Sequence, residues 1–496
     1  MSRILDALTS HARENPGGVA VTGSHVALTW QQLATEITKV EAVLSGKRRV
    51  GLLMANSPAW VVADLACMKT ATTLVPLPSF FSDEQLQHTL LDAGIDLVIT
   101  DDPDRVVAVG KVKRSCLMYI ADKACYCLQL HASPEQTGIE DVIKVTYTSG
   151  TTGSPRGVCL SLETVETVAV SLAEAAAASN TDRALVLLPL SILLENIGSV
   201  YVPLLVGAEL LVPDPAETGL SGSSQVDAGH LASALTKYRP TALIVPPALL
   251  KLLVHLAGAQ LLPDSLRFIA TGGAPIGMSL LAAAASLDLP VYQGYGLSET
   301  GSVVALNTVV DNRPGSVGKP LPHVHIHISD AGEIMVQSDT LADYLKDPVR
   351  ENGNLLATGD TGYIDAEGYL FVTGRMCERI ITSYGRNISP EWIEAELLSH
   401  PAIRQAAVFG NDLPFLVAIL VPMTSGALES MDKVIATINE KLPDYARIDG
   451  WLEANPVFSM ARGELTPSGT LRRRVIEKNY SRQLDGYREH AQENIL

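Results

Sequence analysis

The chain has 496 residues, a net charge of −17 and 47% hydrophobic residues. This length predicts two or three domains with a large apolar core, and the acidic balance argues against non-specific binding to nucleic acid or to an anionic membrane. We expect no signal peptide and no transmembrane segment, because residues 1–20 carry charges throughout and charged or proline residues interrupt the most apolar run. The six cysteines form no CxxC pair and no zinc-like cluster with histidine, which favours a reducing, cytoplasmic location.

Up to about residue 305, short apolar runs alternate with amphipathic stretches. Residues 49–55, 73–78 and 96–100 are strand-like. The spacing predicts helices over 58–70 and 82–94, the second opened by a Ser/Asp cap. The same alternation recurs at 182–190, 241–258 and 266–287. This rhythm predicts parallel sheets covered by helices.

The character of the chain changes after residue 305. Residues 332–339 and 354–374 are rich in Gly, Asp and β-branched residues and predict short antiparallel strands with tight turns, a small β-barrel-like part. A new alternation after Arg375 predicts a compact α+β unit of a usual domain size. We therefore expect an α/β N-terminal domain over 1–376 and a small C-terminal domain over 377–496.

The stretch YTSGTTGSPRG at residues 147–157 combines glycines, hydroxyl side chains and an arginine. Glycines let the backbone bend so that several N–H groups converge on one anion, and Arg156 adds a fixed positive charge. These features predict a triphosphate-binding loop or, alternatively, a plain surface turn. The spacing is not that of the Walker loop. The candidate phosphate-binding residues are Thr148, Ser149, Gly150, Thr151, Thr152, Gly153 and Arg156.

Five further segments follow the loop in order. They are GGAP at 272–275, QGYGLSET at 293–300, TGD at 358–360, VTGR at 372–375 and SYGRNISPEWIEAEL at 383–397. Together with the loop, they resemble the motifs of the adenylate-forming enzymes, which include acyl-CoA synthetases, the adenylation domains of peptide synthetases and luciferases. The resemblance covers nearly the whole chain and is closest to long-chain fatty acyl-CoA synthetases.

The resemblance implies a role for each segment. Glu299 is a hard oxygen ligand that suits a Mg²⁺ ion bridging phosphates, or else a solvated turn residue. Asp360 offers two acceptor oxygens to the paired hydroxyls of a ribose, Arg375 can reach ribose or phosphate or form an interdomain salt bridge, and Tyr295 can stack on adenine or fill the core. The implied nucleotide-binding residues here are Gly273, Ala274, Pro275, Gly294, Tyr295, Gly296, Thr300, Asp360 and Arg375, and the implied catalytic ones are Thr148, Glu299, Thr300, Arg375 and Thr470.

The implied activity is AMP-forming acid–thiol ligation with ATP and Mg²⁺. A carboxylate attacks the α-phosphorus of ATP and releases pyrophosphate, and a thiol, usually that of CoA, then displaces AMP. Catalysis rests on positioning and charge stabilisation. The resemblance implies that the C-terminal domain rotates between the steps about Cys377, where the family has Asp or Lys, and that Gly385 and Arg386 lie on the CoA side.

One segment departs from the family pattern. LTPSGTLRRR at 465–474 places Thr470 at the position of the family's main adenylation lysine. Threonine is uncharged and too short to reach both the carboxylate and the α-phosphate. Three interpretations remain open. In the first, Arg472 compensates, because in a strand it would share the face of Thr470 whereas Arg473 would point away. In the second, adenylation is slow, and in the third, the protein is repurposed to act on a preformed acyl-adenylate. Arg156 replaces the usual loop lysine but keeps its charge.

The segment at 188–208 corresponds to the stretch between the phosphate loop and the acyl pocket. It offers only Glu195 as an acid for an amino group, and Ile192 stands where relatives often have histidine. We therefore expect a small-molecule carboxylic acid substrate, a medium- or long-chain fatty acid, with an aryl acid as the alternative or the run being plain core. The acceptor is CoA, an acyl carrier protein or an amine, and no residue decides between them.

Overall fold

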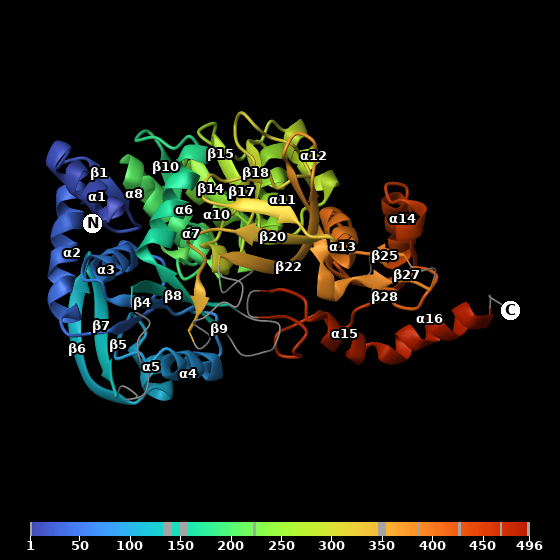
Figure 1. The fold of residues 1–496 in the computed structure, drawn as a ribbon, viewed down its shortest axis with the longest axis horizontal. Helices are drawn as coiled ribbons and strands as arrows, with labels where there is room; N and C mark the ends of the chain where they lie inside the picture. Colours follow the sequence, from blue (N-terminus) through green and yellow to red (C-terminus); the bar gives the residue numbers. More distant parts are fainter. Residues whose placement is uncertain are drawn as a thin grey trace.

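The computed structural model describes residues 2–131, 141–148, 156–221, 225–345, 354–383, 386–424, 428–466 and 469–493. It contains two large sheets with helices packed on them, a small antiparallel sheet and a three-stranded C-terminal sheet (Figure 1). This arrangement confirms the α/β architecture that the sequence predicts. Among the described residues, no helix combines the length and apolar character needed to cross a bilayer.

The first large sheet has the strand order β21-β9-β8-β4-β3-β5-β7-β6. Its central strands run parallel because helices return the chain between them. The outer hairpins are antiparallel. The bounds are β3 (Arg49–Leu53), β4 (Thr73–Pro76), β5 (Leu97–Thr100), β6 (Val112–Ile120), β7 (Lys123–Leu130), β8 (Val142–Thr148), β9 (Arg156–Ser161) and β21 (Asp343–Tyr344).

The second large sheet has the order β18-β17-β16-β15-β14-β10-β11-β1-β2. Strands β1, β11, β10, β14, β15 and β16 form its parallel part. The bounds are β1 (Val19–Thr22), β2 (Ala27–Thr29), β10 (Arg183–Leu185), β11 (Glu209–Leu211), β14 (Ala242–Val245), β15 (Phe268–Thr271), β16 (Val291–Tyr295), β17 (Ala305–Leu306) and β18 (Lys319–Pro320). The two-residue strands β12 (Leu220–Ser221) and β13 (Gln225–Val226) form a separate antiparallel pair.

The helices begin where the sequence supplies caps. The Ser82 hydroxyl accepts a hydrogen bond from the backbone N–H of Gln85, and Gln85 Oε1 accepts one from the backbone N–H of Ser82. Thr29 and Gln32 form the same capping box. The helices of the N-terminal part are α1 (Arg3–Glu14), α2 (Trp30–Leu44), α3 (Pro58–Lys69), α4 (Asp83–Asp92), α5 (Pro103–Val109), α6 (Leu162–Ala175), α7 (Leu193–Asn196), α8 (Val202–Val206), α9 (Pro215–Thr218), α10 (Ala228–Tyr238), α11 (Pro247–Gly258) and α12 (Met278–Ser286). A π-helical turn at Ile197–Tyr201 joins α7 to α8.

The small sheet has the antiparallel order β19-β20-β22-β23, which corresponds to the small β part expected from the sequence. Its bounds are β19 (His325–Ile328), β20 (Glu333–Gln337), β22 (Leu355–Ile364) and β23 (Leu370–Arg375). Beyond it, the chain has two hydrophobic clusters of its own. The elements there are β24 (Ile380–Ile381), β25 (Asn387–Ile388), α13 (Pro390–Ser399), β26 (Ile403–Phe409), β27 (Leu416–Pro422), α14 (Leu428–Asn439), β28 (Ile448–Glu453), α15 (Arg473–Asn479) and α16 (Ser481–Glu493).

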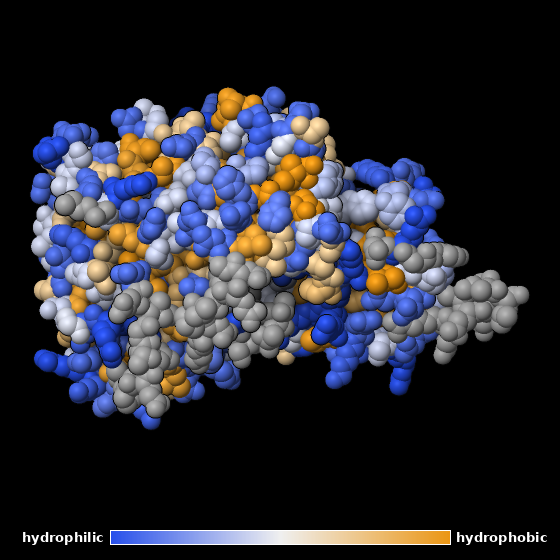
Figure 2. Space-filling model, in the orientation of Figure 1, coloured by the Kyte–Doolittle hydropathy of each residue, from blue (hydrophilic) through white to orange (hydrophobic). Residues whose placement is uncertain are grey.

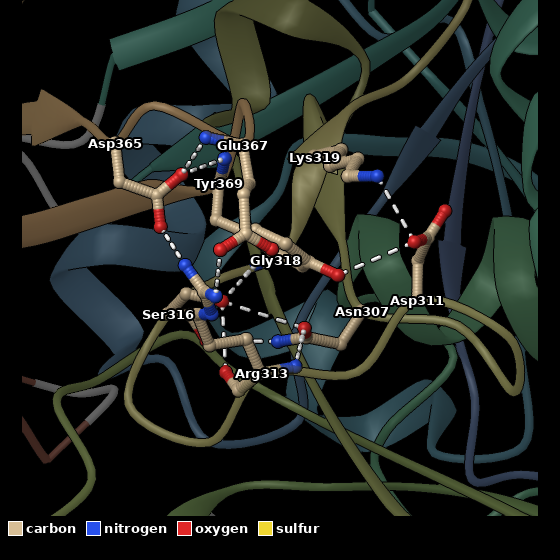
Figure 3. Close-up of polar contacts among 9 residues, drawn as sticks. All are labelled: Asn307, Asp311, Arg313, Ser316, Gly318, Lys319, Asp365, Glu367 and Tyr369. Atoms are coloured by element: carbon tan, nitrogen blue, oxygen red, sulfur yellow. Dashed lines mark hydrogen bonds and ion pairs between the residues drawn. The ribbon is translucent and has the colours of Figure 1, made fainter.

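A group of charged side chains connects the small sheet to the second large sheet (Figure 3). Arg313 forms ion pairs with Asp365 and Glu367, which lie in the turn between β22 and β23, and its guanidinium lies over the ring of Tyr369. Lys319 on β18 pairs with Asp311 at 2.9 Å. We call Asp311, Arg313, Lys319, Asp365, Glu367 and Tyr369 the clamp cluster. It fixes the turn of the β22–β23 hairpin against the large sheet.

The C-terminal part packs on α11 and α12. Glu396 on α13 accepts a hydrogen bond from the backbone N–H of Met278 at 2.7 Å, and Lys251 on α11 donates to the carbonyl oxygens of Leu398 and His400. Figure 1 shows this part, in orange and red, at one side of the molecule. Hydrophobic residues on the face in Figure 2 form separate groups between hydrophilic ones, as on an ordinary protein surface.

A buried ionic network lies between the two large sheets. Lys144 on β8 pairs with Asp64 on α3 at 3.0 Å, and their side chains are 1% and 2% exposed. Lys144 also donates to Asn196 and to Tyr201 Oη, and Tyr201 Oη lies 2.7 Å from Asp64 Oδ2. Burial lowers the pKa of Lys144, while the charge of Asp64 opposes that shift. Each charge therefore depends on the other for its stability in the interior.

We expect the Lys144→Met variant to lose about 3–5 kcal/mol of unfolding free energy, because it leaves the carboxylate of Asp64 buried without its cation. The measurement is denaturant unfolding followed by tryptophan fluorescence. The control is Lys39→Met, which removes a surface lysine paired with Glu36 and should cost at most about 1 kcal/mol. Equal losses in the two variants would contradict this assignment.

Candidate active site

Three predicted residues meet where β16 ends. Tyr295 donates a hydrogen bond to Asp360 Oδ2 at 2.6 Å, and Arg375 Nε lies 3.0 Å from Asp360 Oδ1. Asp360 and Arg375 face each other across the β22–β23 ladder, so the backbone pairing itself sets their contact. The arrangement places a carboxylate, a guanidinium and an aromatic ring together at the carboxyl edge of the second sheet.

The electrostatics of Asp360 suit an acceptor of hydrogen bonds. Its burial raises its pKa, and the hydrogen bond from Tyr295 and the charge of Arg375 oppose that rise. Each carboxylate oxygen has two acceptor sites, so each can take one more donor while Tyr295 and Arg375 stay in place. A pair of neighbouring hydroxyls on a ligand therefore fits this carboxylate.

Glycines bring the segments 272–275 and 293–300 into contact. A Cβ on Gly272 would lie 2.7 Å from the carbonyl oxygen of Gly294, and one on Gly296 would lie 2.0 Å from that of Ser302. Gly273 has a φ of +78°, which other residues rarely adopt. The predicted residues Gly273, Ala274 and Pro275 follow β15 and are exposed. Because the two backbones approach so closely, Gly273, Ala274 and Pro275 lie at the rim of the site beside Tyr295.

A second group of contacts surrounds Glu299, which lies in the 3₁₀ turn Ser298–Thr300. The backbone carbonyl of Glu299 accepts from Ala342 N–H at 2.8 Å, and Tyr344 Oη donates to its carboxylate. The guanidinium of Arg156 stacks over the ring of Tyr344, 3.8 Å from its centre. Tyr344 thus connects the predicted metal ligand to the predicted phosphate-binding arginine.

The phosphate loop itself is described only at its ends. Thr148 on β8 pairs with Arg156 on β9, so both stand at the base of the loop. Thr300, also predicted, accepts from Leu297 N–H and donates to the Leu297 carbonyl, which closes the Glu299 turn. The predictions for Ser149, Gly150, Thr151, Thr152 and Gly153 lie outside the described residues.

The carboxylate of Glu299 fits Mg²⁺ as a single protein ligand. Mg²⁺ keeps several waters and is usually bound through one or two carboxylates together with phosphates. The described part of the chain contains no group of three or more His, Cys, Asp or Glu side chains that could form a complete metal cage. A Mg²⁺ ion at Glu299 would therefore need phosphate oxygens to complete its coordination.

An apolar cavity of about 270 Å³ begins beside these groups. Its walls at this end are Gly272, Gly273, Gly294, Tyr295, Gly296 and Ser298. It extends between the face of the second sheet and the helical segment from Ile192 to Val206. Ile192, which stands where relatives often have histidine, lines it.

Glu195 does not line this cavity. Its side chain is fully buried and accepts a hydrogen bond from the backbone N–H of Leu187 at 3.0 Å, and burial raises its pKa to about 8. It braces the chain before α7. The cavity therefore lacks this acid as a partner for a substrate amino group.

The structure corrects the expectation for residues 470–472. They do not form a strand on which Thr470 and Arg472 share a face. Thr466 N–H donates to the carbonyl oxygen of Thr470, Thr470 N–H donates to Thr466 Oγ1, and Arg472 is the N-cap residue of α15. Arg473, expected to point away, binds Glu394 with two hydrogen bonds of 2.7 and 2.9 Å. It is therefore a structural residue of the C-terminal part.

The remaining predicted residues are Cys377, Gly385 and Arg386, which follow Arg375 in the chain. Cys377 is exposed in a 3₁₀ turn, Met376–Glu378, that follows directly on Arg375. The guanidinium of Arg386 lies 6.0 Å from the ring centre of Tyr445. Gly385 lies outside the described residues.

Sequence reasoning missed Tyr344. It lies on the two-residue strand β21, which pairs with β9 far away in sequence. A strand this short has no periodicity, and only its position opposite the phosphate-loop strand gives Tyr344 its contacts. No local sequence signal could have identified it.

Comparisons with known proteins agree with this geometry. The family model described as AMP-binding enzyme matches residues 8–347, and that of the AMP-binding enzyme C-terminal domain matches 377–492. A 2-succinylbenzoate–CoA ligase of Bacillus cereus is 30% identical, and the alignment covers 80% of this chain and 82% of that protein. A long-chain-fatty-acid–CoA ligase of Mycobacterium bovis is 24% identical, with 88% of this chain and 87% of that protein covered.

Solved structures share the fold. An anthranilate CoA ligase in complex with anthranoyl-AMP has a TM-score of 0.79 at 20% identity and covers 97% of both chains. An o-succinylbenzoate CoA synthetase of Bacillus subtilis with its acyl-adenylate intermediate has a TM-score of 0.75 at 23% identity, with 96% of this chain and 97% of that chain covered.

Proposed function

Because the chain belongs to the AMP-binding enzyme family, we propose that it is an ATP-dependent acid–thiol ligase that forms an acyl-adenylate and transfers the acyl group to CoA. The observation that carries this proposal is a pair of contact groups joined by a short stretch of chain. Tyr295 contacts Asp360, the turn of Glu299 follows three residues later, and Glu299 is linked through Tyr344 to Arg156. The apolar cavity opens beside these contacts at Tyr295.

Each group then has a task on ATP. Asp360 and Arg375 hold the ribose, the ring of Tyr295 faces the adenine, and Arg156 with the loop hydroxyls binds the phosphates. Mg²⁺ bound at Glu299 would neutralise phosphate charge. A carboxylate oxygen of the substrate forms a bond to the α-phosphorus while the bond to pyrophosphate breaks, and the thiol sulfur of CoA later attacks the acyl carbon as its bond to AMP breaks.

We propose a medium- or long-chain fatty acid as the substrate, with an aryl acid as the alternative. The support is the apolar lining of the cavity: of the described residues that line it, only Asp182 and Arg267 carry charge, and they pair with each other. A second carboxylate, such as that of 2-succinylbenzoate, finds no uncommitted cation there. The relative from Mycobacterium bovis agrees with the fatty acid.

Thr470 supports a second candidate function. Without the lysine, the protein would take up a preformed acyl-adenylate and pass the acyl group to CoA, a carrier protein or an amine. In both cases, we propose that residues 377–496 move relative to residues 1–376 about the exposed turn at Cys377.

The test is incubation with ATP, Mg²⁺ and a panel of fatty, aryl and dicarboxylic acids, with and without CoA. We expect pyrophosphate release and, by mass spectrometry, acyl-AMP without CoA and acyl-CoA with it. If no acid releases pyrophosphate but synthetic acyl-AMP is converted to acyl-CoA, the second function holds. If neither reaction occurs, both proposals fail.

A further inference from the structure

The far end of the apolar cavity, away from Tyr295, is lined by charged residues, whereas its side walls are apolar. Along most of its length, small apolar residues leave the space open: Ala184, Ala242 and Ala270 stand on adjacent strands of the sheet face. Opposite them, Gly198 in the π-helical turn has no side chain, and a Cβ there would lie 2.5 Å from Cδ1 of Ile244. The cavity therefore owes its width to missing side chains on both walls.

The length of the cavity follows from strand β15. Lining residues flank this four-residue strand at both ends, Gly272 on the nucleotide side and Arg267 on the far side. At about 3.3 Å per residue, the cavity runs roughly 15–17 Å along the strand. An extended alkyl chain advances about 1.25 Å per carbon–carbon bond, because each bond of about 1.5 Å is inclined to the chain axis. A chain of about 12 to 14 carbons therefore has a similar length.

Arg267 closes the far end. Its Nε donates to Asp182 Oδ1 at 2.6 Å, a second nitrogen also binds this carboxylate, and Nη1 donates to the carbonyl oxygen of Ala176 at 2.8 Å. Nη2 also lies 3.2 Å from the carbonyl oxygen of Ala177. The guanidinium thus joins the end of α6 to the start of β10.

Asp182 in turn is firmly held. It is 5% exposed and accepts hydrogen bonds from Ser179 N–H at 2.8 Å and from the Thr241 hydroxyl at 2.7 Å. A planar guanidinium fixed by several hydrogen bonds forms a rigid wall. The guanidinium is also an unfavourable contact for the apolar end of an acyl chain, which would have to displace those hydrogen bonds to pass it.

We propose that Arg267, positioned by Asp182, is the end wall that limits the length of the acyl chain to about 12 to 14 carbons. This inference rests on the proposed function and specifies its substrate. Affinity should rise about fourfold with each added methylene, as for burial of apolar groups, until the chain reaches the wall, and should then stop rising.

The test is equilibrium dialysis with radiolabelled dodecanoate, displaced by unlabelled saturated acids of eight to eighteen carbons. Wild-type protein should show a plateau in affinity near 14 carbons. Arg267→Ala should remove the plateau and raise the affinity ratio of the 18-carbon to the 12-carbon acid at least tenfold. Ala242→Leu, which fills the far part of the cavity, should move the plateau to shorter acids.

The matched control is Arg183→Ala. Arg183 starts β10 beside Asp182, pairs with Glu209 and is 34% exposed against 33% for Arg267, but it does not line the cavity. In Arg183→Ala, the dependence of affinity on the length of the acid should equal that of the wild type. If the profiles of Arg267→Ala and Ala242→Leu also equal it, the end wall is refuted while the proposed function stands. If wild-type protein binds no fatty acid of any length, the proposed substrate class fails instead.

Discussion

Replacing Thr470 with lysine should raise the rate of pyrophosphate release by about 10²–10³-fold, because it restores one charged donor to the developing charge on the α-phosphate. Thr470 is exposed, and its hydrogen bonds with Thr466 use the backbone N–H and carbonyl of Thr470, which lysine also has. The measurement is the initial rate of pyrophosphate release with ATP, Mg²⁺ and a 12-carbon fatty acid.

Two comparisons make this test specific. Thr437→Lys adds the same charge at an exposed threonine of α14 and should leave the rate unchanged. Thioester formation from synthetic acyl-AMP and CoA should also change little in Thr470→Lys, because that step does not use the α-phosphate as an electrophile. If pyrophosphate release stays at the wild-type rate, the missing lysine is irrelevant to adenylation by this protein.

Replacing Glu299 with glutamine should lower pyrophosphate release by about 10²–10³-fold, equivalent to roughly 3–4 kcal/mol of activation free energy. Glutamine keeps an oxygen that can accept from Tyr344 but loses the charge that a Mg²⁺ ligand supplies. The rate should also need more Mg²⁺ to reach its half-maximum, which a titration of the metal measures.

The control for this variant is Glu163→Gln, an exposed acid in the first turn of α6. It should leave both the rate and the Mg²⁺ requirement at wild-type values. Binding of ATP in the presence of EDTA should be similar in Glu299→Gln and in wild type. A normal Mg²⁺ titration of Glu299→Gln would show that this carboxylate is not the metal ligand.

The alternation of strands and helices was predictable because it depends on local patterns. The cap at Ser82 and the apolar run of β3 place their elements where the sequence predicts them. The strand expected over 182–190 is shorter, Arg183–Leu185, because the chain turns near Pro189, where Ile192 N–H bonds back to its carbonyl. Local propensity gives the type of an element better than its length.

The site was predictable where a motif carries its own geometry. Asp360 and Arg375 belong to one hairpin, so their pairing follows from a nearby turn. Arg473 and Glu394 are 79 residues apart, and only tertiary packing joins them. The same holds for Arg267 and Asp182, whose separation in sequence hides the end of the cavity.

The clamp cluster should make one half of the proposed active site sensitive to ionic strength. Its ion pairs are partly open to water, with the Arg313 side chain 35% exposed, so added salt screens them over a Debye length that shrinks from about 8 Å at 0.15 M to 3 Å at 1 M. The hairpin it fastens carries Asp360 and Arg375. If Asp360 and Arg375 hold the nucleotide as proposed, concentrated salt should weaken nucleotide binding while it leaves the apolar cavity unchanged.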